Sequence, residues 1–289
     1  MRRHSRQLFV AELLALAVTG MTFAPAAVAQ PGPPGFGTDH FLCYEATESN
    51  PNTPITISLD DQFCAEEDPE GRFCLANVSA MTALEFCNPT SKDVFGHPPV
   101  DIEEPNAHLT FYELTQKLPA ARTKVVVENQ FGRQTLRVAA PRLVAVPTLK
   151  NGEGDEGDLG DINHFTCYEA SGKRVLVEAD VEDQFRPDAP LTILVHSPHF
   201  LCNPTVKSRG SEESPVPDEN DHLVCYKVTP SENPPGTTSV SVENQFEGFV
   251  ADEAGDTFQI GPLHFLCAPS HKLGCTPAIG DCPEPPPTP

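Results

Sequence analysis

The chain has 289 residues, and 41 Asp and Glu against 19 Lys and Arg give it a formal net charge of −22. Binding to nucleic acid or to an anionic membrane surface requires clustered basic residues, so this composition argues against both. Hydrophobic residues make up 39% of the chain, which is enough for a core, and the length allows one large domain or two ordinary ones.

Residues 1–29 have the pattern of a signal peptide. Three arginines lie within the first six residues, a mostly apolar stretch follows at 8–23, and small residues at 27 and 29 form a cleavage pattern before Gln30. The sequence therefore predicts a secreted protein, extracellular or periplasmic, with no membrane insertion once the signal is removed.

Three short blocks recur in the same order four times along the chain, which defines unit one (40–92), unit two (108–150), unit three (164–207) and unit four (222–272). Each unit opens with a His/Tyr block, continues with an Asx-Gln-Phe block and closes with a Pro-Thr/Ser block that ends in Lys. The repeated positions are His40, Tyr44, Gln62 and Phe63; His108, Tyr112, Gln130 and Phe131; His164, Tyr168, Gln184 and Phe185; and His222, Tyr226, Gln245 and Phe246.

These repeated side chains have two interpretations. The histidines could bind ligands or sense pH, and the Gln-Phe pairs could form a recognition edge. Positions present in every unit are better explained by folding, with the histidine at a strand start, the amide at a turn and the phenylalanine in the core. We therefore expect structural roles for them.

Alternating apolar and polar residues, as in Ile55, Ile57 and Leu59, predict strands and not helices. We expect three or four short antiparallel strands per unit, hence an all-β protein of tandem repeats, sandwich- or barrel-like and stapled by disulfides. The predicted organisation is a β domain at 37–150 with units one and two, an acidic Gly-rich linker at 151–161, a β domain at 162–272 with units three and four, and a Cys/Pro-rich tail at 273–289.

The ten cysteines are predicted to form five disulfides. Units one, three and four each have a cysteine before the tyrosine and another in the closing block. Unit two has Phe111 and Ala145 at these two places, and the joint absence is what a bonded pair predicts. The predicted pairs are Cys43–Cys87, Cys167–Cys202, Cys225–Cys267, Cys64–Cys74 and Cys275–Cys282.

Metal binding is the alternative for some of these cysteines. Units three and four offer sets of two His and two Cys: His164, Cys167, His199 and Cys202, and His222, Cys225, His264 and Cys267. Residues i and i+3 of a strand point to opposite faces, and units one and two have Leu84 and Arg142 in place of the second histidine, so we expect no zinc site. Calcium at the acidic 151–161 linker is a weak alternative, because the spacing does not fit a calcium loop.

No catalytic motif with a nucleophile and base, a metalloprotease helix or a phosphate-cradling loop is present, so the sequence does not predict an enzyme. We expect an exported structural or binding protein, multivalent through its four units, with an extracellular protein or glycan as partner. The alternatives are an enzyme or metal-handling protein whose site is assembled from the His and Cys of the repeats, and a secreted protease inhibitor.

The recurring pattern His-x-x-Cys-Tyr, then Gln-Phe, then Leu-Cys-x-Pro-Ser/Thr-x-Lys resembles a domain of unknown function found, often in tandem, in secreted bacterial proteins. It is most complete at 221–227, 244–246 and 266–272, and it covers about residues 39–272. The resemblance implies export and a bacterial source but supplies no activity and no catalytic residues.

Overall fold

A computed structural model describes residues 38–49, 54–64, 75–154, 159, 162–187, 189–232, 238–246 and 256–285. The predicted signal peptide at 1–29, Cys74 and most of the acidic linker lie outside these residues. The named elements of the described part are thirteen strands. No helix among the described residues is long and apolar enough to cross a membrane.

Each unit contributes three strands, as expected, but one of the three is long. The long strands have 19 to 21 residues and bend at register shifts, which lets the two halves of one strand pair with different neighbours. The strands are β1 (His40–Glu48), β2 (Ile55–Asp61), β3 (Leu75–Asp93), β4 (His108–Leu114), β5 (Thr123–Asn129), β6 (Gly132–Lys150), β7 (Phe165–Ser171), β8 (Val177–Asp183), β9 (Leu191–Arg209), β10 (Glu212–Ser214), β11 (His222–Pro230), β12 (Thr238–Asn244) and β13 (Asp256–Thr276).

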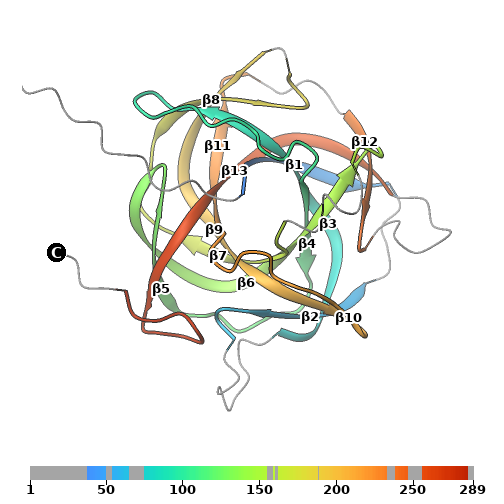
Figure 1. Cartoon of the computed structure of the whole chain (residues 1–289), viewed down its shortest axis with the longest axis vertical. Helices are drawn as coiled ribbons and strands as arrows, with labels where there is room; N and C mark the ends of the chain where they lie inside the picture. The colour runs from blue at the N-terminus through green and yellow to red at the C-terminus, as the bar shows by residue number, and fades with distance from the viewer. Residues whose placement is uncertain are drawn as a thin grey trace, which may run out of the picture. The chain divides into compact units, whose positions relative to one another are not determined.

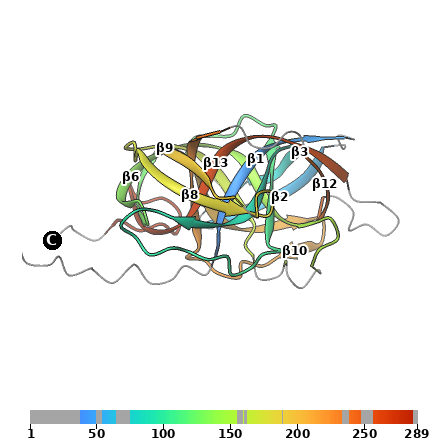
Figure 2. The ribbon, with the colours of Figure 1, turned by 90° about the horizontal axis from the view of Figure 1, so that it is seen from above.

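The first and third strands of the four units form a closed antiparallel ring. Its order is β1, β3, β4, β6, β7, β9, β11 and β13, and β13 pairs again with β1. Figure 1 views this ring end-on, and Figure 2 shows the same ribbon turned by 90°. The prediction of an all-β protein of antiparallel strands is confirmed.

The second strand of each unit lies outside the ring and links two units that face each other across it (Figure 1). β2 pairs with β3 of its own unit and β9 of unit three, and β8 pairs with β9 and β3. β5 pairs with β6 and β13 in the same way, and β12 with β13 and β6. Units one and three are thus interlocked, as are units two and four.

The predicted division into two β domains was wrong. Residues 32–289 form one compact unit, and the strands of all four units belong to one sheet. Had units one and two formed a domain of their own, their strands would have paired with each other and not with opposite units. The tail begins inside the sheet, since β13 extends to Thr276, where it pairs with Lys124.

Alternation along the ring strands divides the buried side chains into an inner and an outer core. Phe41 and Cys43 belong to a cluster to which all eight ring strands or their flanking residues contribute, while Leu42 and Tyr44 belong to the larger cluster on the other face. The inner cluster contains three disulfides, Cys43–Cys87, Cys167–Cys202 and Cys225–Cys267.

The predicted cysteine pairing is confirmed for these three pairs and for Cys275–Cys282. Phe111 and Ala145 of unit two face each other in the register that the bonded pairs occupy elsewhere, and both are fully buried. They fill with side-chain volume the space that a disulfide fills in the other units. Cys64 is also disulfide-bonded, but its predicted partner Cys74 lies outside the described residues.

Candidate functional site

The four repeated tyrosines pack against the four repeated phenylalanines, and each pair joins opposite units. Every tyrosine is buried. Because each tyrosine contacts a phenylalanine of the opposite unit, these side chains hold the units together. The ring centroids of Phe63 and Tyr168, Tyr112 and Phe246, and Phe131 and Tyr226 are each 4.9 Å apart, and those of Tyr44 and Phe185 are 5.2 Å apart.

The Asx residue before each Gln-Phe pair makes the turn and also reaches the tyrosine of the opposite unit. In unit two, the Asn129 side chain accepts a hydrogen bond from the Phe131 amide (2.9 Å) and donates one to the Tyr226 hydroxyl (2.9 Å). Asn244 of unit four does the same with Phe246 and Tyr112. We call these contacts the amide crossing.

Units one and three have aspartates at this position, and we call their contacts the acidic crossing. Asp61 accepts hydrogen bonds from the Phe63 amide (2.8 Å) and from the Asn203 side chain (3.4 Å), and it lies beside the Tyr168 hydroxyl. Asp183 makes the equivalent contacts, since it accepts hydrogen bonds from the Phe185 amide and from the Asn88 side chain. Burial raises the pKa of Asp61 to about 6, although the hydrogen bonds and Lys272 act against that shift.

The lysine that ends each closing block lies over one of these phenylalanines, a role that the sequence analysis did not predict. Lys92, Lys150 and Lys207 are buried and Lys272 is partly buried, and burial lowers the pKa of each of the four. From ammonium nitrogen to ring centroid the distances are 4.4 Å for Lys92 and Phe131, 5.2 Å for Lys150 and Phe185, 5.2 Å for Lys207 and Phe246, and 4.7 Å for Lys272 and Phe63.

Three of these lysines have a carboxylate close enough to raise the pKa of the ammonium group, whereas Lys92 has none among the described residues. The carboxylates are Asp183 and Glu153 for Lys150, Glu212 for Lys207 and Asp61 for Lys272. The Nζ of Lys92 has no hydrogen-bond partner in the described part of the chain, and burial lowers its pKa to about 7. Lys92 is therefore a buried lysine with no carboxylate counterion among the described residues.

The four leading histidines are buried, as expected for structural positions. Burial, and after it the charge of the nearby closing lysine, lowers the pKa of each histidine, to about 3 for His108. Neutral imidazoles of this kind do not titrate near neutral pH, which argues against the pH-sensing alternative. Neither ring nitrogen of His40 has a hydrogen-bond partner among the described residues.

The alternative of a two-His, two-Cys zinc site is wrong, because the cysteines of both sets are bonded to each other. The second histidines lie elsewhere: His199 stacks on Phe265, with ring centroids 5.4 Å apart, and His264 contacts Glu85. In the described part of the chain, no group of three or more His, Cys, Asp or Glu side chains is arranged to hold a metal ion.

Charged side chains gather where one end of the ring opens, around a cavity of about 160 Å³. His264 Nδ1 is 2.9 Å from the Glu85 carboxylate, and Arg142 lies 3.5 Å from Glu169 and 3.9 Å from Glu113. Hydrogen bonding to Glu85 raises the pKa of His264. Because these charges compensate one another, the cluster offers little to a ligand.

A larger cavity, of about 580 Å³, lies on the side of the ring where unit one is followed by the loop 94–103. This loop, the start of β1, the β5–β6 turn at 129–132 and Val177 line it. The loop is pinned at both ends. Lys92 and Val100 exchange two backbone hydrogen bonds of 2.9 Å, and the Asp39 carboxylate accepts hydrogen bonds from the amides of Glu103 (2.9 Å) and Glu104 (2.8 Å).

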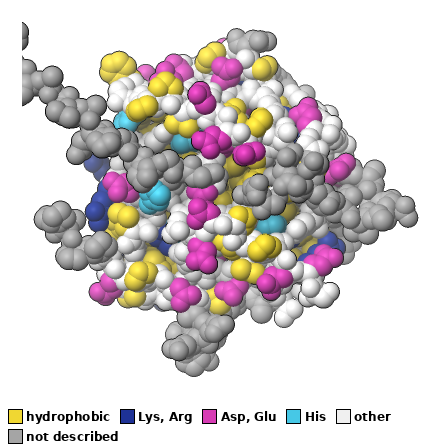
Figure 3. Space-filling view, viewed as in Figure 1, with side chains coloured by type: hydrophobic (Ala, Val, Ile, Leu, Met, Phe, Trp, Pro, Cys, Tyr) yellow, Lys and Arg dark blue, Asp and Glu magenta, His cyan; other side chains and the backbone are white. Residues whose placement is uncertain are grey.

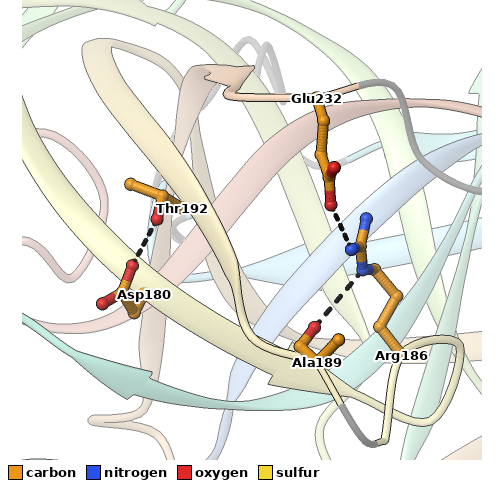
Figure 4. Close-up of polar contacts among 5 residues, drawn as sticks. All are labelled: Asp180, Arg186, Ala189, Thr192 and Glu232. Atoms are coloured by element: carbon orange, nitrogen blue, oxygen red, sulfur yellow. Dashed lines mark hydrogen bonds and ion pairs between the residues drawn. The ribbon is translucent and has the colours of Figure 1, made fainter.

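The Gln-Phe turn of unit two leaves room for this cavity. The glutamines of the other three units hydrogen-bond to connecting segments, as Gln184 does to the Pro105 carbonyl, whereas Gln130 lines the cavity. The residue after the phenylalanine also differs. In unit three it is Arg186, which contacts Glu232 and the Ala189 carbonyl beside the Thr192–Asp180 hydrogen bond (Figure 4), and in unit two it is Gly132, with φ 91°.

Two large apolar side chains that are exposed adjoin the cavity walls. Phe95 is fully exposed at 101%, next to Val94, and Leu176 is 53% exposed, next to Val177. Figure 3 shows carboxylates spread over one face of the molecule, with few basic groups among them.

Comparisons with protein-family models, with curated proteins and with solved structures find no match for this chain. The resemblance to a family of secreted bacterial domains therefore stays a prediction, and it contributes nothing to the assignment of the site.

Proposed function

We propose that the protein is an exported binding protein that holds a small apolar ligand in the cavity between the loop 94–103 and the turn 129–132. The observation that carries this proposal is the cavity itself. Its volume of about 580 Å³ lies inside the range of roughly 300–1,000 Å³ that small-molecule sites occupy.

The walls of the cavity suit such a ligand. Val94, Val100, Phe131 and Val177 supply apolar surface, and a few polar groups such as Gln130 stand among them. The pinned ends of the loop and the disulfides inside the ring make the site rigid, and rigidity lowers the entropic cost of binding. Multiple disulfides are also consistent with an extracellular or periplasmic location.

This proposal replaces the multivalent attachment suggested by the repeats alone. Residues from units one, two and three line the cavity together with the loop between units one and two. The site therefore belongs to the closed ring and not to a single unit, and it takes one ligand per chain.

Titration with N-phenyl-1-naphthylamine, a neutral probe that fluoresces in apolar sites, tests the proposal. Because the chain has no tryptophan, the probe signal is not overlapped by indole emission.

Val177→Phe puts a larger ring into the cavity wall and should weaken probe binding at least about tenfold, since lost space forfeits about 1.4 kcal/mol or more. Val228→Phe, at another partly buried valine packed against the outer core, is the matched control. Absence of saturable binding, or equal loss in both variants, would reject the proposal.

Phe95 favours a second candidate function, inhibition of a protease with an apolar specificity pocket. The side chain is fully exposed on a loop whose ends are pinned at Lys92 and Val100, which is how inhibitory loops present their specificity residue. The wild-type protein should then inhibit chymotrypsin and Phe95→Ala should not. A wild-type protein that leaves chymotrypsin fully active rejects this candidate without affecting the binding proposal.

A further inference from the structure

We infer that the ligand of the cavity is an apolar acid, whose anionic group lies at the inner end against His40, with Lys92 behind it as a buried counter-charge. This inference rests on the proposed function and names the chemical class of the ligand. Two buried side chains whose nitrogens have no hydrogen-bond partner among the described residues carry it: His40 lines the cavity, and Lys92 lies over Phe131, which lines it too.

His40 is the donor that an anion would meet first. Its side chain lines the cavity, the residue is 2% exposed, and neither ring nitrogen has a hydrogen-bond partner among the described residues. A buried polar group without a hydrogen-bond partner destabilises the folded protein, so a ligand that accepts its N–H removes that penalty. A neutral imidazole offers one N–H donor to a carboxylate.

Lys92 supplies the charge. It is also 2% exposed, its Nζ lies 4.4 Å from the centroid of the Phe131 ring, and Phe131 and His40 both line the cavity. The ammonium group is close enough to His40 for its charge to lower the pKa of the imidazole. A ligand anion bound at His40 would therefore lie one side chain away from an uncompensated positive charge.

The other units show what a compensated lysine looks like in this fold. Lys150, Lys207 and Lys272 occupy the same position over a phenylalanine, and each has a carboxylate of the chain nearby. The described residues provide none for Lys92, and the ring that it lies over, Phe131, lines the cavity. The anionic group of the ligand would compensate the charge of Lys92, as Asp61, Asp183 and Glu212 compensate the other three lysines.

The acidic residues at the cavity do not reverse this conclusion. Both oxygens of the Asp39 carboxylate accept backbone hydrogen bonds, from Glu103 and Glu104. Asp101 and Glu103 are exposed, so water and salt screen their charges. The inner end, where screening is weakest, carries the cation, and the apolar walls between the two ends fit a hydrocarbon chain.

Isothermal titration of the full mature chain with decanoate and with decan-1-ol tests the inference, because the two probes share the chain length and differ in the charged group. The wild-type protein should bind decanoate about tenfold or more tightly than the alcohol, the ratio expected for a charge-assisted contact. Lys92→Met should reduce that ratio to near one and leave decan-1-ol binding unchanged. Lys207→Met, at the equivalent lysine of unit three, should keep the wild-type ratio.

Every other outcome contradicts the inference, and one of them contradicts the proposed function as well. Equal binding of acid and alcohol by the wild-type protein, or a preference for the acid that survives in Lys92→Met, overturns the inference while the binding proposal stands. Failure of both probes to bind the wild-type protein overturns the inference and the proposed function together. Circular dichroism and urea unfolding of each variant check that a change in affinity does not come from a change in folding.

Discussion

The acidic crossing between units one and three and the amide crossing between units two and four have the same geometry but different chemistry. In the acidic crossing, Asp61 and Asp183 accept hydrogen bonds from Asn203 and Asn88. In the amide crossing, Asn129 and Asn244 donate hydrogen bonds to the hydroxyls of Ser270 and Thr148, and Ala268 and Val146 stand where the donor asparagines would be. The Asx residue of the turn and the residue opposite it therefore differ together between the two crossings, because an aspartate acceptor needs a donor and an asparagine donor needs an acceptor.

This difference shows that charge is balanced locally within the fold. Each buried aspartate of the acidic crossing has a lysine nearby, Lys272 for Asp61 and Lys150 for Asp183. The lysines over the phenylalanines of the amide crossing have no aspartate there, so Lys207 relies on Glu212 while Lys92 has no carboxylate among the described residues. Lys92 lies over Phe131, which lines the large cavity, and this contact links the amide crossing to the proposed ligand site.

The largest expected effect concerns the disulfides, because unit two of the amide crossing has none at its centre. Cys167→Ala with Cys202→Ala removes a cross-link across 35 residues and should cost about 4 kcal/mol of the free energy of unfolding, by the loop-closure argument. Cys167→Phe with Cys202→Ala copies the pair Phe111 and Ala145 and should recover part of that loss, since the ring restores buried apolar volume.

Urea unfolding followed by circular dichroism measures both variants of unit three. Equal unfolding midpoints for the two variants would show that the interior of unit three cannot accept the packing of unit two. The two units would then not be equivalent at this position despite their common register.

The same substitution at two lysines should change stability by different amounts. Lys92→Met removes a buried cation for which the described residues supply no carboxylate. It should stabilise the protein by about 3 kcal/mol at pH 6, since each unit of pKa shift corresponds to about 1.4 kcal/mol and the lost contact with Phe131 offsets part of the gain. Burial lowers the pKa of Lys272 to about 7 as well, but Lys272→Met should give a smaller gain, because Asp61 loses its nearby cation and Asn203 loses a donor.

The effect at Lys92 should depend on pH. The folded state releases the proton of Lys92 near pH 7 and the unfolded state near pH 10.5, so the penalty is full below pH 7 and fades as the pH rises toward 10.5. Chemical denaturation at pH 6 and at pH 10 should therefore show the gain from Lys92→Met shrinking at the higher pH. An equal gain at both values would mean that Lys92 is charged in the folded protein throughout this range.

Sequence patterns predicted the local features of this fold and missed the long-range ones. Alternation along 55–59 gave strands, and the joint loss of two cysteines at Phe111 and Ala145 gave the pairing, because both signals are carried by residues within one unit. The crossing of β2 to β9 has no such signal, since pairing between opposite units uses backbone groups that every strand has. This is why two domains were predicted where one closed ring exists.

The candidate site escaped prediction for a related reason. Lysine is almost never fully buried, so its recurrence at the end of each closing block was not recognised as a core position. That recurrence was nevertheless the available signal, because a surface lysine need not return in every unit. The cavity could not be predicted, since the loop 94–103 and Gly132 differ between units and only their meeting in space creates it.

The smallest expected effect comes from converting one half of the acidic crossing to the amide type. The pKa of Asp61 is raised to about 6 in the folded protein, so the folded state keeps a proton that the unfolded state releases near pH 4. Between these values the folded state binds more protons, and the free energy of unfolding must fall as the pH rises.

Asp61→Asn removes that fall but keeps the side-chain oxygen that the Phe63 amide needs. Relative to wild type, the variant should gain about 2 kcal/mol between pH 4 and pH 6.5, measured by urea unfolding at each pH. Asn244→Ala, which removes an amide that does not titrate, is the control and should give a difference from wild type that is constant over this range. Parallel profiles for wild type and Asp61→Asn would show that Asp61 is already ionised at pH 4, and the two crossings would then differ in hydrogen bonding but not in protonation.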